Sequence, residues 1–97
     1  MMLEIRPSCE NCDKDLPPNS LEAMICAFEC TFCITCVNDV LENVCPNCGG
    51  GFERRPVLRK KYLDRLDPDR KRVYKPVDMA SYMPKREQLK SVPPSER

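Results

Sequence analysis

The spacing of eight cysteines restricts what this chain can fold into more than any other feature of its sequence. They form four close pairs within forty residues: Cys9 and Cys12, Cys26 and Cys30, Cys33 and Cys36, Cys45 and Cys48. A gap of two or three residues lets the backbone turn so that both sulfurs of a pair face one metal ion. Eight sulfurs complete two tetrahedral sites with none left over. The spacing therefore predicts two closed metal sites.

Zinc is the metal we expect, and three other uses of the cysteines were weighed against it. Disulfides suit an exported chain, but the opening residues MMLEIRP contain no apolar core of a signal peptide, so we expect a cytoplasmic chain with reduced thiols. Iron uses the same tetrahedral sulfur geometry and stays the alternative metal. A catalytic zinc needs a position open to water. Eight thiolates saturate two ions, and the chain has no histidine, so we expect structural sites and no enzyme.

The local patterns around the cysteines predict a small α+β domain over residues 1–52. Residues 23–32 are typical of a hairpin that carries Cys26 and Cys30. Apolar residues then follow at helical spacing from Val37 to Val44, which predicts a two-turn amphipathic helix leading into Cys45. A unit of this size buries little apolar surface by itself and needs staples such as metal sites. No window approaches the roughly 18 apolar residues of a membrane span.

Charge divides the chain into two unlike halves. Residues 1–48 carry two basic and eight acidic side chains, and residues 49–97 carry fourteen basic and seven acidic ones. The basic half could bind nucleic acid, with Tyr62 and Tyr74 available for stacking. The candidate nucleic-acid-binding residues are Arg54, Arg55, Arg59, Lys60, Lys61, Arg70, Lys71 and Arg72. The alternative is that the segment folds back and neutralises the acidic half.

The basic half is divided here into two parts. Residues 53–78 are expected to form a partly helical extension, because Leu58, Tyr62 and Leu66 are spaced as on one helix face and Asp67 could begin a second turn running to Tyr74. We expect residues 56–75 to pack against the cysteine-rich half as one or two short helices. Residues 79–97 show little apolar periodicity and no cap, and are expected to be a flexible tail.

The cysteine-rich half resembles a RING finger. The segment from Cys30 to Cys36 is similar to the RING pattern with cysteine in place of its usual histidine, and the helix and the Cys45–Cys48 turn also match. This resemblance implies interleaved pairing, in which the first and third pairs bind one ion and the second and fourth bind the other. Site 1 would then be Cys9, Cys12, Cys33 and Cys36, and site 2 Cys26, Cys30, Cys45 and Cys48. A sequential, LIM-like pairing would need a longer excursion before the last pair.

The chain departs from RING ubiquitin ligases at the positions that contact the conjugating enzyme. Those ligases usually carry an apolar residue inside or beside the first pair and a basic residue just after the last ligand. Here these positions are Glu10-Asn11 and Gly49-Gly50. The departures argue against ubiquitin-ligase activity.

At the level of the whole chain, the sequence resembles a bacterial cysteine-rich family known as domain of unknown function 1272. The segments that carry this resemblance include Leu3–Pro7, Cys9–Cys12, Asp15–Pro18, Ile25–Cys36 and Val44–Gly50. The family implies a bacterial cytoplasmic zinc protein and supplies no known activity. Three functions were therefore weighed: a protein-interaction adaptor, a nucleic-acid-binding protein, and a thiol redox or zinc-buffering protein. We expect the adaptor.

Overall fold

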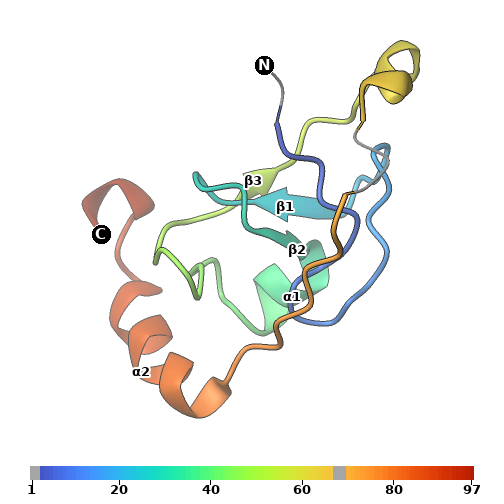
Figure 1. Cartoon of the computed structure of the whole chain (residues 1–97). Helices are drawn as coiled ribbons and strands as arrows, with labels where there is room; N and C mark the ends of the chain where they lie inside the picture. Colours follow the sequence, from blue (N-terminus) through green and yellow to red (C-terminus); the bar gives the residue numbers. More distant parts are fainter. Residues whose placement is uncertain (1–2, 67–69) are drawn as a thin grey trace.

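A three-stranded antiparallel sheet lies at the centre of the computed structural model, which describes residues 3–66 and 70–97 (Figure 1). Strand β1 (Ala23–Ile25) lies between β2 (Thr31–Cys33) and β3 (Glu53–Arg54). Met24 of β1 is in register with Phe32 on one side and Arg54 on the other. The predicted hairpin is thus confirmed, and the chain is a small α+β protein.

Helix α1 (Ile34–Asp39) follows β2 without a loop, and it is shorter than the sequence pattern predicts. The prediction of a helix running to Val44 is wrong because the chain turns back after Val40. Glu42 and Asn43 have φ of 46° and 63°, a left-handed conformation that ends a helix. The side chain of Asn43 also accepts a hydrogen bond from the Phe52 amide, at 2.9 Å. The apolar residues of the pattern still point inward, since Val37, Leu41 and Val44 are buried.

The core combines sulfur with a few apolar side chains. Phe32 and Phe52 meet edge to face with ring centroids 5.5 Å apart, and Leu16 is fully buried beside the same cluster. Six of the fifteen buried apolar residues in the described part of the chain are cysteines. The stability of this core therefore depends strongly on whether the sulfurs bind a metal ion.

Arg55 is the largest fully buried side chain, with 1% of its surface exposed. Its guanidinium donates to the carbonyl oxygens of Arg6, Leu16 and Pro17 at 2.8–3.1 Å. It thereby joins the sheet to the N-terminal segment and to the loop at Pro17. Arg55 is one of the cations expected to be available for nucleic acid, but in the fold it is buried and three backbone oxygens already bind its guanidinium.

The segment expected to pack against the cysteine-rich half as one or two short helices does so only weakly. In its described residues it contains one 3-10 turn, η1 (Lys60–Arg65), which buries none of its side chains and projects from the sheet at the upper right of Figure 1. The Tyr62 ring contacts its own neighbours, with the Arg65 guanidinium 4.8 Å from its centroid. Asp67, expected to begin a second turn, lies outside the described residues, and residues 70–74 form no helix.

The expected flexible tail is instead built into the fold, and this prediction is wrong. Helix α2 (Met79–Leu89) begins at Asp78, whose carboxylate accepts from the Ala80 amide, and a short turn η2 (Pro94–Glu96) follows. Tyr82 is 5% exposed, and its hydroxyl lies 2.9 Å from the Leu41 carbonyl oxygen and 2.5 Å from that of Val44. Tyr82 is the one buried side chain of α2, a helix whose sequence shows almost no apolar periodicity.

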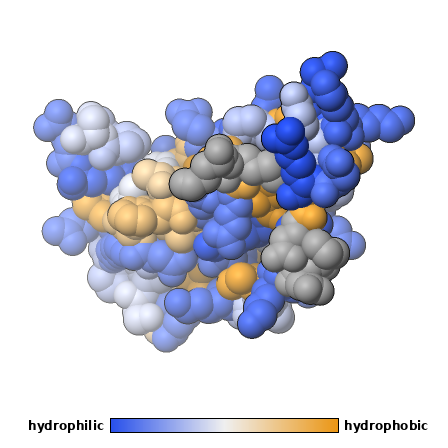
Figure 2. Space-filling model, turned by 45° about the horizontal axis from the view of Figure 1, so that its top comes forward, coloured by the Kyte–Doolittle hydropathy of each residue, from blue (hydrophilic) through white to orange (hydrophobic). Residues whose placement is uncertain are grey.

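On the face shown in Figure 2 most residues are hydrophilic, and hydrophobic ones gather across its middle, most clearly at the centre left. Among residues 3–66 and 70–97 the exposed large apolar side chains are Leu21, Phe28, Ile34, Val57, Leu63 and Tyr74. None of the helices in residues 3–66 and 70–97 has the length and apolar character that crossing a bilayer requires.

Candidate metal centres

The first cysteine cluster brings together Cys9, Cys12, Cys33 and Cys36, whose sulfurs all lie within 4.8 Å of one another. The first two come from a tight loop, and the other two stand at the end of β2 and in the first turn of α1. The loop is fixed to β2 through Glu10. The Glu10 amide donates to the Thr31 carbonyl at 3.0 Å, and the Glu10 carboxylate accepts from the Thr31 amide at 2.8 Å.

The spacing of these sulfurs matches a tetrahedral metal site. A zinc–sulfur bond of about 2.3 Å places any two sulfurs of a regular tetrahedron about 3.8 Å apart. The sulfurs of Cys12 and Cys33 are 3.7 Å apart. A disulfide would hold them at about 2.05 Å, and all eight cysteines are free. The cluster therefore has room for one ion at its centre.

The second cluster brings together Cys26, Cys45 and Cys48, again with sulfurs within 4.8 Å of one another. Cys30, the fourth residue of the predicted site, is buried beside them, and its carbonyl oxygen accepts from the Cys26 amide at 3.2 Å. The Cys30 sulfur does not lie within 4.8 Å of all three of the other sulfurs. The hairpin turn supplies Cys26 and Cys30, and the turn after Val44 supplies Cys45 and Cys48.

The two clusters combine the cysteine pairs in the order that the RING resemblance implied. The first and third pairs form one cluster, and three of the four cysteines of the second and fourth pairs form the other. Two groups of sulfurs that could hold metal ions are thus present. Their identity as ligands, and the metal itself, stay predictions.

Burial makes these sulfurs difficult to ionise without a cation. It raises the pKa of Cys36 and of Cys45 well above that of an ordinary thiol. Burial also acts to raise the pKa of the more exposed Cys12 and Cys48, but hydrogen bonds to their thiolates outweigh it, so the pKa of each is lowered. The largest of these hydrogen bonds comes from the Lys14 backbone at Cys12 and from the Gly50 backbone at Cys48. A metal ion is the natural partner for such a set, because it favours the thiolate form at every sulfur.

At each cluster one amide outside the set of sulfurs donates a hydrogen bond to a sulfur. The Gly50 amide lies 3.4 Å from the Cys48 sulfur, and the side-chain amide of Asn11 lies 3.4 Å from that of Cys36. Such outer contacts orient metal ligands and offset their charge. The sequence reasoning missed Asn11, and its only signal was its position between Cys9 and Cys12.

The family described as "Protein of unknown function (DUF1272)" matches residues 2–58, which include both clusters and Arg55. The chain belongs to this family. The DUF1272 chain is also 53% identical over 75 residues to uncharacterized protein R02474 of Rhizobium meliloti (strain 1021). That similarity covers 77% of this chain and 89% of the relative. No solved structure matches the chain.

The basic residues nominated for nucleic acid are divided in this DUF1272 protein between internal and exposed positions. Arg55 is buried, Arg70 donates to the Ile5 carbonyl at 3.3 Å, and Arg72 forms ion pairs with Asp13 and Asp15. These three side chains already have partners within the fold. The other five, Arg54, Arg59, Lys60, Lys61 and Lys71, are exposed, as is the ion-paired Arg72.

Proposed function

We propose that this DUF1272 protein is a structural zinc-binding protein that acts as a small protein-interaction adaptor. The observation that carries the metal-binding part is the geometry of the clusters, which gather sulfurs from distant parts of the chain within 4.8 Å of one another. In the first cluster the sulfurs of Cys12 and Cys33 lie 3.7 Å apart, as in a tetrahedral site. Four thiolates per ion leave no coordination position for water or substrate, which supports a structural and not a catalytic role. Free thiols in such number suit a reducing compartment, so we place the protein in the cytoplasm.

We expect the purified protein to contain two zinc ions per chain, bound by sulfur alone. Elemental analysis would count the metal, and thiol titration in denaturant with a chelator would count eight free thiols. One ion per chain would contradict the second site, and stoichiometric iron would replace zinc. Metal-free protein with disulfides would instead favour the thiol redox function.

The adaptor part of the proposal is supported by Phe28. This side chain stands in the turn between β1 and β2 with 73% of its surface exposed, and it lines an open hollow with Cys30, Asn47 and Cys48. The turn carries cysteines of the second cluster, so a bound ion would hold the backbone of this turn, and with it the position of Phe28, in place. Rigid exposed aromatic side chains are enriched where proteins bind each other.

A photoreactive phenylalanine analogue at position 28 tests this role. In cells of the source organism we expect it to form a discrete cross-linked product with one protein. The matched control is the same analogue at Tyr74, which is 58% exposed and should give no such product. The partner should bind the purified wild-type protein, and its affinity should fall at least tenfold for Phe28→Ser. Equal binding of both proteins would exclude this surface.

A further inference from the structure

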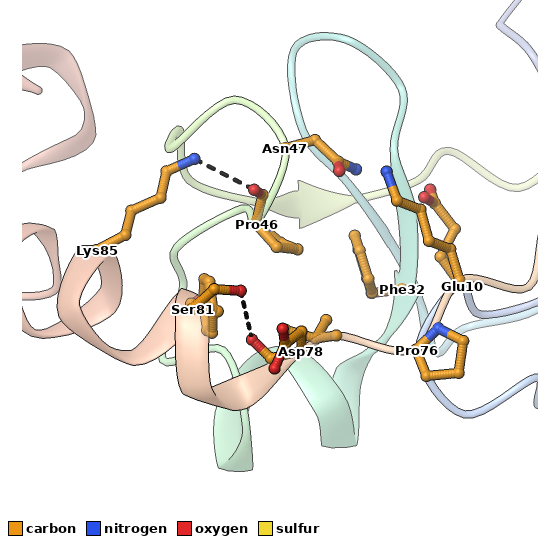
Figure 3. Close-up of a pocket in the computed structure, with 11 residues that line it drawn as sticks. Glu10, Phe32, Pro46, Asn47, Pro76, Asp78, Ser81 and Lys85 are labelled. Atoms are coloured by element: carbon orange, nitrogen blue, oxygen red, sulfur yellow. Dashed lines mark hydrogen bonds between the residues drawn. The ribbon is translucent and has the colours of Figure 1, made fainter.

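Residues 75–89, called the strap below, contact the cysteine-bearing turns of both clusters. At its start, the Lys75 amide donates to the Glu10 carbonyl at 2.7 Å, inside the Cys9–Cys12 turn. Further on, the Lys85 ammonium donates to the Pro46 carbonyl at 3.2 Å, inside the Cys45–Cys48 turn (Figure 3). A cavity of about 270 Å³ remains beneath it, lined by strap residues together with Glu10 and Pro46. The strap therefore bridges the two turns and does not fill the space between them.

At the first cluster the strap acts through Asn11. The Val77 amide donates to the Asn11 side-chain oxygen at 2.9 Å, and the nitrogen of the same carboxamide lies 3.4 Å from the Cys36 sulfur. A carboxamide is planar, so fixing its oxygen also fixes the direction of its N–H groups. The strap thereby aims a hydrogen-bond donor at one sulfur of the cluster.

At the second cluster the strap lies directly on the turn that carries Cys45 and Cys48. A Cβ atom at Gly49 would lie 3.2 Å from Leu89 and 3.3 Å from the Lys85 side chain, so the strap packs against this glycine. Gly49 also has φ of 78°, a conformation that other residues rarely adopt. A positive ammonium is held in this way beside a site that four thiolates and one divalent ion would leave with a net charge of −2.

The strap is held in place by contacts that do not involve sulfur. Tyr82 is anchored on the Leu41 and Val44 carbonyls, and Arg86 donates to the Val40 carbonyl at 2.8 Å and pairs with Glu42 at 3.0 Å. Changing Asn11 or Lys85 should therefore leave the strap seated. This separation makes the contacts to the clusters testable one at a time.

We infer that the strap slows the release of the ions from both metal sites. At the first site it orients the Asn11 hydrogen bond to Cys36, and at the second it supplies the positive charge of Lys85. This inference rests on the proposed metal-binding function. Loss of an outer contact of this kind commonly lowers metal affinity by about 10- to 100-fold. If the strap helps the sites retain their ions, removing one of its contacts should speed ion loss by a factor in that range. The effect should be confined to the site that the contact serves.

The test uses the full chain loaded with cadmium-113, which gives a separate NMR signal for each site, and follows loss of each signal after addition of excess EDTA. Asn11→Asp keeps an oxygen for the Val77 amide and removes the donor to Cys36. Val77→Pro removes the strap amide and leaves Asn11 intact. Lys85→Met keeps the packing on Gly49 and removes the charge. Lys71→Met is the control, because Lys71 is an exposed lysine outside the strap.

We expect Asn11→Asp and Val77→Pro to speed ion loss from one site by about tenfold, and Lys85→Met to speed it from the other. The control should match the wild type. Wild-type rates in all three variants, or equal acceleration at both sites in each, would overturn the inference. Absence of metal from protein purified from cells would count against the proposed function alone, because cadmium loading tests the strap independently.

Discussion

Removal of metal by EDTA is expected to unfold residues 9–48 of the purified protein. Binding of a structural zinc contributes about 10–16 kcal/mol in small zinc-binding peptides, whereas a whole domain is usually stable by only about 5–15 kcal/mol. The metal-free core cannot compensate, since six of its fifteen buried apolar residues in the described chain are cysteines. Without a metal ion these six cysteines are small apolar thiols that no longer share a bound ion.

Far-UV circular dichroism and amide NMR spectra, recorded before and after EDTA, would measure this loss. Adding zinc back should restore the folded spectrum. Acid should act as EDTA does, because protons compete with zinc for the thiolates. The control is Tyr74→Ala, which changes an exposed side chain and should lose and regain its fold as the wild type does. A folded spectrum in protein shown to be metal-free would contradict the expectation.

Tyr82→Ala is expected to destabilise the zinc-loaded protein by about 3–5 kcal/mol. Removing a buried aromatic ring leaves a cavity that costs about this much. The change also removes the hydroxyl that lies on the Leu41 and Val44 carbonyls, just before the second cluster's turn at Cys45. Since Tyr82 is the one buried residue of α2, we expect this helix to pack less firmly, while the Arg86 contacts with Val40 and Glu42 remain.

Urea denaturation at a fixed zinc concentration would measure the change in free energy of unfolding. Tyr74→Ala is again the matched control, since Tyr74 is 58% exposed and should change stability by less than about 0.5 kcal/mol. Tyr82→Phe should fall between the two, because it keeps the ring and loses only the hydroxyl. If Tyr82→Ala and Tyr74→Ala were equally stable, the described packing of α2 would be wrong.

The parts of the fold that the sequence predicts are those governed by short-range geometry. Two cysteines separated by two or three residues restrict the turn between them, and the hairpin from Ala23 to Cys33 follows directly from such a turn. The apolar positions Val37, Leu41 and Val44 are buried as their spacing indicates. Only the end of α1 differs, because the left-handed residues Glu42 and Asn43 leave no signal in an apolar pattern.

The contacts that the sequence could not predict join residues about forty or more positions apart. Tyr82 reaches Leu41, and the Val77 amide reaches Asn11 across 66 positions. Helix α2 buries a single side chain, so its packing produces no periodic pattern, and its Asp78 cap is one residue among many acidic ones. The expected attraction between the two charged halves does occur at Arg72 with Asp13, but in an extended segment and not in the helices proposed for it.

The burial of Arg55 sets one limit on how far this protein can be shortened. The last cysteine is Cys48, and a fragment ending at residue 52 would appear to contain everything that the metal sites require. Such a fragment would leave the carbonyl oxygens of Arg6, Leu16 and Pro17 without their donor. The N-terminal segment is synthesised first but gains this anchor only after all eight cysteines have been made. Any shortened fragment must therefore extend beyond residue 55, seven positions after the last cysteine. The buried Tyr82 of α2 sets a second limit, further along the chain.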